Sequence, residues 1–497
     1  MNLLKNKPSA DILMFSMRSM GYSFESAVAD IIDNSISAGA KKIRINFPMD
    51  PSECFLTICD DGCGMLHDEL FDAMKYGSEK KRKGRSETDL GRFGLGLKSA
   101  SLSQCRKLTV ISKKDSLISG FCWDLDVVEE KRDWYVIELS DETIRTVPGV
   151  AWLKRQASGT VVLWENFDII EKSSGNVYSE LSRYQNSVSD YLSLIYHRYL
   201  NRTGSGKISM RINNYTLKGL DPFLENHKKT NVRRRIEIPV ADSNGKEHMV
   251  TVQPFILPFQ KDLSDADKKL SGGIENYRTK QGFYVYRNER LIIWGTWFGR
   301  PRDELTKYAR IRVDIPNTLD DIWGIDIKKQ NAKIPNIIRS RLTKAVDEAM
   351  DIAIQKQTFR GRLDKADEST DYIWDRIKER DQYSYRINRN SRIFDLIRKK
   401  VDDETWNTLD MVLEEIESSL PYQQIYIDKS QNKIDEPTEN DERLAEVEEK
   451  GKMLIRIALS MGEIKNRRQI VDNLFRSEPF VNYPSLKNKL LEDNEND

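Results

Sequence analysis

The sequence predicts an α+β protein in three parts, with boundaries near residues 203 and 345. Residues 1–203 mix helical and strand patterns and hold most of the glycine clusters, whereas residues 204–345 read mainly as strands between turn signals. From residue 346 onward the chain is charged, with apolar residues at helical spacing. We therefore expect two α/β domains and a helical C-terminal region (346–497) suited to dimerisation or partner binding.

Length and composition limit the classes of protein to which the chain can belong. The chain has 497 residues, and 79 Lys and Arg stand against 78 Asp and Glu, a formal net charge of +1. This balance excludes a globally basic nucleic-acid coat but not a local basic patch. No run of eighteen apolar residues occurs, so no membrane span is expected. Five cysteines confined to the first quarter, and an N-terminus without an apolar leader, indicate a reduced, cytoplasmic protein.

Residues 24–38 have the spacing of a helix that ends at a glycine. Asp30, Asp33, Asn34 and Ser37 fall on the face opposite the apolar one. An ordinary surface helix with a solvated polar face fits this pattern. A helix that directs Asp30 and Asn34 into a cleft also fits, since a carboxylate one turn before an amide can orient a water while the amide oxygen ligates Mg²⁺. Residues 24–38 alone do not decide between these two interpretations.

Two strands are predicted next, at residues 41–47 and 54–61. The second leads into a turn in which Asp60, Gly62 and Gly64 form the pattern D-x-G-x-G. Paired glycines allow positive φ and a close approach of a ligand to the backbone. An Asp at the strand end can accept a hydrogen bond from an exocyclic amine, although a plain Asp–Gly turn is the simpler alternative.

A zinc site is another interpretation of this stretch, because Cys54, Cys59, Cys63 and His67 lie within fourteen residues. Zinc sites usually pair cysteines separated by two to four residues. Here Cys54 and Cys59 would bracket a strand, so buried or incidental cysteines are favoured.

A polar, basic segment at residues 77–89 precedes a glycine-rich helix start. Such a segment is typical of a lid that orders over a ligand. Gly91, Gly94 and Gly96 then precede helix-compatible residues, which exposes backbone N–H groups in an anion-binding arrangement, and Lys98 adds a cation. The spacing and context match neither a dinucleotide-binding fingerprint nor a Walker A loop.

In this order, the three motifs resemble the GHKL superfamily of ATPases, which includes gyrase B, the large heat-shock chaperone ATPases, MutL and histidine kinases, and look most like its bacterial MORC-like branch. The resemblance covers roughly residues 10–200 and extends more loosely to about 345. It implies a Bergerat-type α/β sandwich for residues 1–203 and a transducer-like domain, with the ribosomal S5 domain 2-like fold, for residues 204–345. ATP and Mg²⁺ are the implied cofactors.

The resemblance also implies roles for individual residues. Asp30 takes the place of the catalytic acid and Asn34 that of the Mg²⁺ ligand, while Asp60 and Thr160 lie where the family binds adenine. The other implied nucleotide-binding residues are Gly62, Gly64, Met65, Gly91, Phe93, Gly94, Leu95, Gly96, Leu97, Lys98 and Ser99. The family usually has Glu where this chain has Asp30, one methylene shorter, so turnover is expected to be slow. Glu25 is a poor substitute because it lies about 140° around the helix.

The second domain is expected to contain a strand pair in residues 282–293 that turns at 287–289. Its relatives send a switch lysine from this domain to the γ-phosphate. The best match is Lys333, with Lys328 and Lys329 as alternates, and a solvated loop charge is the ordinary alternative for each.

The implied function is ATP hydrolysis in an ATP-gated homodimeric clamp. The same resemblance implies DNA as the client, in a bacterial antiviral-defence or restriction-associated system with protein partners from the same operon. Basic clusters at residues 80–85, 233–235 and 386–398 are candidate phosphate contacts, and solvated charge is the alternative for each. A chaperone-like ATPase acting on a protein client is the second hypothesis. A histidine kinase is not expected, since none of the four histidines has the context of a phosphoacceptor helix.

Overall fold

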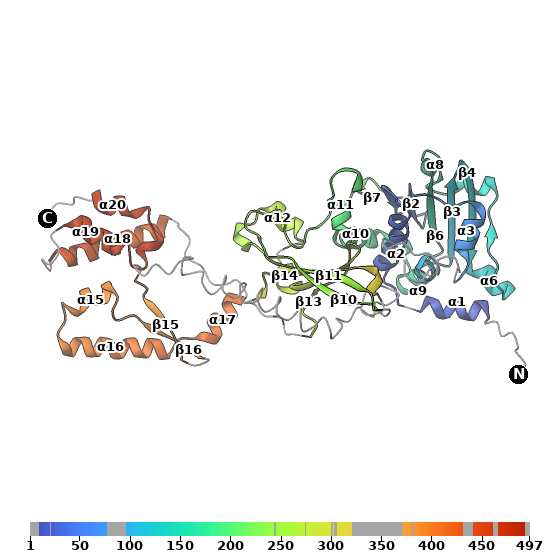
Figure 1. Cartoon of the computed structure of the whole chain (residues 1–497). Helices are drawn as coiled ribbons and strands as arrows, with labels where there is room; N and C mark the ends of the chain where they lie inside the picture. Colours follow the sequence, from blue (N-terminus) through green and yellow to red (C-terminus); the bar gives the residue numbers. More distant parts are fainter. Residues whose placement is uncertain are drawn as a thin grey trace, which may run out of the picture. The chain divides into compact units, whose positions relative to one another are not determined.

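The computed structural model describes residues 9–19, 21–76, 96–242, 245–273, 275–299, 302, 306–320, 371–379, 382–430, 441–460 and 466–492. The chain forms two compact units, Met1–Gln357 and Thr358–Asp497. Figure 1 shows two sheets in the first unit and mostly helices in the second. The predicted α+β class is confirmed.

The first unit opens with a mixed sheet of eight strands in the order β5-β4-β3-β6-β2-β1-β7-β8. Its strands are β1 (Lys42–Asn46), β2 (Phe55–Asp60), β3 (Lys107–Lys114), β4 (Leu117–Asp124), β5 (Ile137–Glu138), β6 (Gly159–Glu165), β7 (Ser209–Ile212) and β8 (Tyr215–Thr216). The β1–β7 pair is parallel and the other pairs are antiparallel. Because β7 and β8 belong to this sheet, it extends past the boundary expected at residue 203.

Ten helices accompany this sheet within the described residues. They are α1 (Ala10–Arg18), α2 (Phe24–Ser37), α3 (His67–Met74), α5 (Gly96–Leu102), α6 (Leu125–Lys131), α7 (Asp141–Thr146), α8 (Val150–Leu153), α9 (Asp168–Ser174), α10 (Val177–Ile195) and α11 (His197–Leu200). The predicted helix at 24–38 is confirmed as α2, which begins where the Ser23 side chain accepts a hydrogen bond from the Ser26 N–H. Its apolar face packs into the main core with Ile43, Ile45 and Trp164.

The side of α2 opposite that apolar face is buried at two positions, whereas Asn34 is partly exposed and Ser37 is exposed. Asp30 is 3% exposed and Asp33 is 1% exposed. The interpretation of a surface helix with a solvated polar face is therefore wrong for Asp30 and Asp33. Helix α5 packs along α2, and α10 contacts both α2 and the second sheet, so α2 is covered from more than one side.

The second sheet of the first unit is also mixed, in the order β10-β11-β14-β12-β13, with β9 paired to β11. Its strands are β9 (Asn231–Val232), β10 (Ile236–Ala241), β11 (Glu247–Ile256), β12 (Gly282–Arg287), β13 (Arg290–Thr296) and β14 (Ala309–Ile315), and its helices are α12 (Asp265–Leu270) and α13 (Asn276–Thr279). The predicted strand pair is confirmed as β12–β13, in which Arg287 pairs with Arg290 around the two-residue turn Asn288-Glu289. The helix expected from about residue 336 lies outside the described residues.

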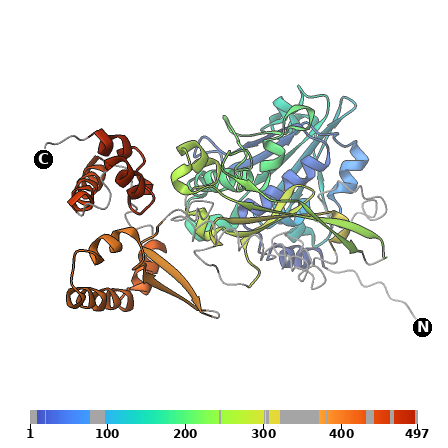
Figure 2. The ribbon, with the colours of Figure 1, turned by 60° about the vertical axis from the view of Figure 1, so that its left-hand side comes forward.

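In its described residues, the second unit combines a hairpin with helices (orange and red in Figure 2). Its elements are β15 (Trp374–Glu379), β16 (Gln382–Ile387), α15 (Arg392–Arg398), α16 (Asp403–Ser418), α17 (Tyr422–Ser430), α18 (Asp441–Ser460), α19 (Arg467–Leu474) and α20 (Leu486–Glu492). Helices α18, α19 and α20 share a core that includes Ile455, Val471 and Leu490. The helices were predicted and the hairpin was not. No helix in the described part of the chain is both long and apolar enough to cross a bilayer.

Candidate functional site

Helix α2 carries Asp30 and Asn34 one turn apart, beside the first residue of α5. Asp30 Oδ2 accepts a hydrogen bond of 2.9 Å from the Tyr22 hydroxyl. A Cβ atom added to Gly96 would lie 3.5 Å from the same carboxylate oxygen, so the start of α5 borders Asp30. Asn34 is partly exposed. A buried carboxylate and a partly exposed amide thus lie together, and these groups can orient a water molecule and ligate Mg²⁺.

Asp60 lies at the end of β2, next to the same helix. One carboxylate oxygen accepts a hydrogen bond of 2.9 Å from the Gly62 N–H, and the other accepts one of 2.9 Å from the Ser35 hydroxyl on α2. Asp60 is 5% exposed, and this burial raises the pKa of Asp60 to about 6, although the two hydrogen bonds act in the opposite direction. Ser35 therefore connects Asp60 to the helix that carries Asp30 and Asn34.

Close packing leaves no room for a side chain at either glycine of the D-x-G-x-G turn. Gly64 has φ +65°, and a Cβ there would lie 2.0 Å from the Lys113 carbonyl oxygen on β3. A Cβ at Gly62 would lie 2.8 Å from that of Ala38 at the end of α2. These two glycines hold the turn between α2 and the first sheet, whether or not a ligand approaches it.

Thr160 and Met65 both contact Ser112 on β3. Thr160 pairs with Asp60 across β2 and β6, and its hydroxyl lies 3.1 Å from that of Ser112. The Met65 N–H donates to the Ser112 hydroxyl at 2.9 Å. Ser112 on β3 was not predicted, and it connects two residues that were.

The described residues of the predicted phosphate-binding run lie on α5. Lys98 is 2% exposed, and its ammonium donates to the carbonyl oxygens of Ala73 at 2.8 Å and Lys75 at 2.7 Å, at the end of α3. Ser99 is buried and Leu97 packs against the main core. The other predicted residues, which are Gly91, Phe93, Gly94, Leu95, Lys328, Lys329 and Lys333, and the lid at 77–89, lie outside the described residues.

Arg290, at the start of β13, is a site residue that sequence reasoning missed. It is 2% exposed, and its Nε donates to Asp33 Oδ1 at 2.8 Å. Its Nη2 lies 3.8 Å from Asp30 Oδ1. The Tyr196 hydroxyl lies 2.7 Å from the same Asp33 oxygen. The signal that the sequence offered for Arg290 was an arginine directly after a tight turn, at the start of a mainly apolar strand.

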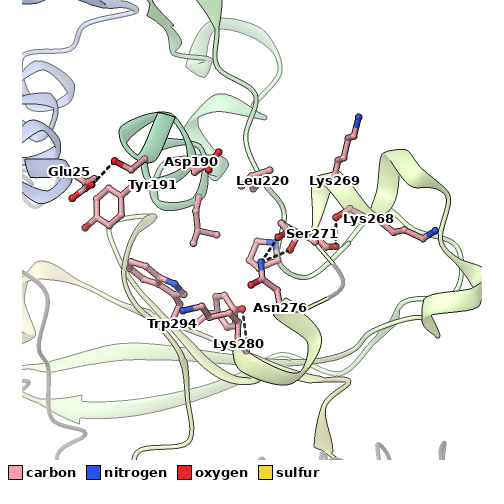
Figure 3. Close-up of a pocket in the computed structure, with 16 residues that line it drawn as sticks. Glu25, Asp190, Tyr191, Leu220, Lys268, Lys269, Ser271, Asn276, Lys280 and Trp294 are labelled. Carbon is pink, nitrogen blue, oxygen red and sulfur yellow. Dashed lines mark hydrogen bonds between the residues drawn. The ribbon is translucent and has the colours of Figure 1, made fainter. Parts of the chain in front are cut away.

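A cavity of about 690 Å³ lies elsewhere, between α10 and the second sheet (Figure 3). Tyr191 and Trp294, whose ring centroids are 5.8 Å apart, line it together with Glu25 and Lys280. Glu25 accepts a hydrogen bond of 2.6 Å from the Ser187 hydroxyl there. Glu25 therefore lies at this cavity, and neither Asp30 nor Asn34 lines it.

The cysteines are not grouped with other metal-binding side chains in the part of the chain that the structure describes. Within the described ranges, which include all five cysteines, no three His, Cys, Asp or Glu side chains are grouped closely enough to hold a metal ion. Burial raises the pKa of Cys59 to about 12, which disfavours the thiolate that zinc requires.

Residues 22–160 match the family of histidine kinase-, DNA gyrase B- and HSP90-like ATPases. The matched range contains α2 with Asp30 and Asn34, the Asp60 turn, and Thr160. The N-terminal part of the chain is thus a GHKL-type ATPase domain.

Distant homologues of this part belong to the MORC family. The chain is 36% identical to ATPase morc-1 of Caenorhabditis elegans over 95 residues, which are 19% of this chain and 11% of that protein. It is 31% identical to MORC family CW-type zinc finger protein 1 of Homo sapiens over 136 residues, which are 26% of this chain and 12% of that protein. The corresponding protein of Mus musculus is 34% identical over 136 residues, 13% of its length. The chain therefore spans only about an eighth of these relatives.

Proposed function

We propose that the first unit binds ATP with Mg²⁺ and hydrolyses it slowly to ADP and phosphate. The single observation that carries this proposal is the buried Asp30 one turn before the accessible Asn34, on the α2 helix of the matched range. In this proposal the first sheet with its helices is a Bergerat-type sandwich, and the second sheet is a transducer-like domain.

The proposed roles follow from where the side chains lie. Asp60 accepts a hydrogen bond from the adenine amine, and Asn34 ligates Mg²⁺ through its amide oxygen. Mg²⁺, when bound, neutralises charge on the phosphates. Asp30 orients the attacking water and takes its proton, and positioning matters more than basicity in this reaction. A short Asp that already accepts a hydrogen bond from Tyr22 supports a low rate.

Measuring Mg²⁺-dependent phosphate release tests the proposal. We expect Asn34→Ala to abolish hydrolysis and Asp30→Ala to abolish turnover while nucleotide affinity stays within about threefold. Asp141→Asn, which changes an exposed carboxylate on α7, is the control and should keep the full rate. Unchanged hydrolysis in Asn34→Ala would remove the metal-ligand role, and unchanged turnover in Asp30→Ala would remove the base.

We further propose that ATP drives a homodimeric clamp that acts on DNA, with a bacterial defence role and partners from the same operon as the biological setting. Among the basic clusters, residues 233–235 are one candidate contact, because Arg234 and Arg235 are exposed, with Arg235 3.8 Å from Glu237. In the cluster at 386–398, Arg389 forms ion pairs with Asp410 and Glu417, and Arg398 pairs with Asp403. DNA that accelerates hydrolysis would support the clamp, and acceleration by unfolded protein instead would favour the chaperone-like alternative.

A further inference from the structure

The turn of the β12–β13 hairpin is held firmly against the helices of the first sheet. Asn288 and Glu289 form the turn with φ of +46° and +65°. The Tyr199 hydroxyl donates to the Asn288 carbonyl, and Arg202 forms an ion pair with Glu289. Tyr286 and Leu291, on either side of the turn, belong to the main core. The position of Arg290 relative to α2 is therefore determined by packing on both sides of the turn.

Arg290 brings a single positive charge to two buried carboxylates. Its guanidinium lies between Asp33, at 2.8 Å, and Asp30, at 3.8 Å. Burial lowers the pKa of Arg290, but the neighbouring Asp33, with Tyr196, Tyr191 and Asp30, outweighs it and raises that pKa overall, so the residue stays charged. A buried carboxylate without such a partner would destabilise the fold strongly.

The two oxygens of Asp30 are held from different elements. Tyr22, before α2, donates to Oδ2, while Arg290, from the second sheet, approaches Oδ1. Contacts on both oxygens restrict rotation of the carboxylate about its last torsion angle. A planar guanidinium can serve two carboxylates at once, which a lysine ammonium does less well.

We propose that Arg290 is a positioning residue, which orients the Asp30 carboxylate for catalysis and connects the second sheet to the base. The inference rests on the proposed function, since it assumes that Asp30 acts on a water molecule. In this inference Arg290 need not touch the nucleotide or the water. It acts through Asp30, and it compensates for the short reach of an Asp in place of Glu.

The test compares Arg290→Met and Arg290→Lys with the matched variant Arg198→Met in the full chain. Arg198 bridges α11 to the same sheet, through Glu289 in the hairpin turn and Asp314 on β14, and its ion pairs do not involve α2. We expect Arg290→Met to lower kcat about tenfold or more, with KM for ATP within about twofold, because misplacing a catalytic group affects the chemical step. Arg290→Lys should recover part of the loss, and Arg198→Met should keep kcat within about twofold.

The double variant Arg290→Met/Asp33→Asn distinguishes the positioning role of Arg290 from a purely structural one. Removing the second buried charge should restore much of the melting temperature lost in Arg290→Met, whereas kcat should stay low. Recovery of kcat together with stability, or a wild-type kcat in folded Arg290→Met, would overturn the inference alone. Absence of Mg²⁺-dependent hydrolysis in the unmodified chain would instead contradict the proposed function.

Discussion

Asp60 is buried, and this burial opposes ionisation of its carboxyl group. Because its pKa in the folded protein, about 6, exceeds the ordinary value of 3.8, the folded state binds the proton more tightly than the unfolded state. This residue's contribution to stability is therefore largest at acidic pH and is lost as pH rises through about 6. At neutral pH the ionised side chain destabilises the nucleotide-free protein by up to about 3 kcal/mol, since one pKa unit corresponds to about 1.4 kcal/mol.

Asp60→Asn should therefore stabilise the nucleotide-free protein at pH 7.5 and weaken ATP binding at least about tenfold. The amide keeps an acceptor for the Gly62 N–H but removes the buried charge. Thermal melts and calorimetry measure the two effects. Asp61→Asn is the control, because Asp61 accepts hydrogen bonds from the Lys41 and Lys42 N–H groups instead. Full ATP affinity in Asp60→Asn would contradict the adenine role.

Nucleotide affinity should fall about tenfold between pH 7.5 and pH 5. Asp60 is mostly protonated at pH 5, because its pKa is about 6, and only the ionised form offers a full carboxylate acceptor. Titrating ADP binding in the wild type and in Asp60→Asn separates this effect from titration of the ligand's own phosphates. The ratio of the two affinities should shrink at low pH, and a constant ratio would count against the prediction.

Single residues were predictable where the relevant geometry is local. Asp30 and Asn34 share a face because they are four positions apart on a helix. Asp60 was predictable because it lies at the end of a strand. Arg290 was not predictable, since its partner Asp33 lies 257 positions away and no periodicity connects them. The burial of Asp30 and Asp33 was missed for the same reason, because α5, Tyr196 and Arg290, which lie against them, are distant in the sequence.

At the scale of elements, the turn that follows Asp60 packs directly against strand β3. Gly64→Ala should destabilise the protein by about 3 kcal/mol, because a Cβ would combine a positive φ with a clash against the Lys113 carbonyl. Gly39→Ala is the matched control. Gly39 also has positive φ, at +76°, but no atom lies within 4 Å of a Cβ there, so about 1 kcal/mol is expected. Denaturant unfolding measures both, and equal losses would show that strain alone matters.

Elements formed by neighbouring residues were predicted to within a few positions, as α2, β1, β2 and the β12–β13 pair show. The parallel pairing of β7 with β1 was not predicted, because parallel partners are distant in sequence. The β15–β16 hairpin was missed in a region expected to be helical. Polar and apolar residues alternate in Gln382–Ile387, and that was the available signal, whereas Trp374–Glu379 shows no such alternation.

At the scale of the whole molecule, the proposed clamp predicts a change of assembly with nucleotide. Sedimentation of the full chain should show a larger dimer fraction with Mg²⁺ and a non-hydrolysable ATP analogue than with ADP. Asn34→Ala should not respond to the analogue, which makes it the control. An identical distribution in both nucleotides would argue against gating by ATP.

The ion pair between Arg290 and Asp33 also has a consequence for biosynthesis. Helix α2 leaves the ribosome long before β13, since 257 positions separate the two residues. Until β13 follows, Asp30 and Asp33 lack this guanidinium, and docking α2 onto the nascent sheet would enclose two uncompensated anions. Expressed fragments that stop ahead of β12 should therefore be cleaved rapidly by proteases, whereas fragments that extend through β14 should resist them.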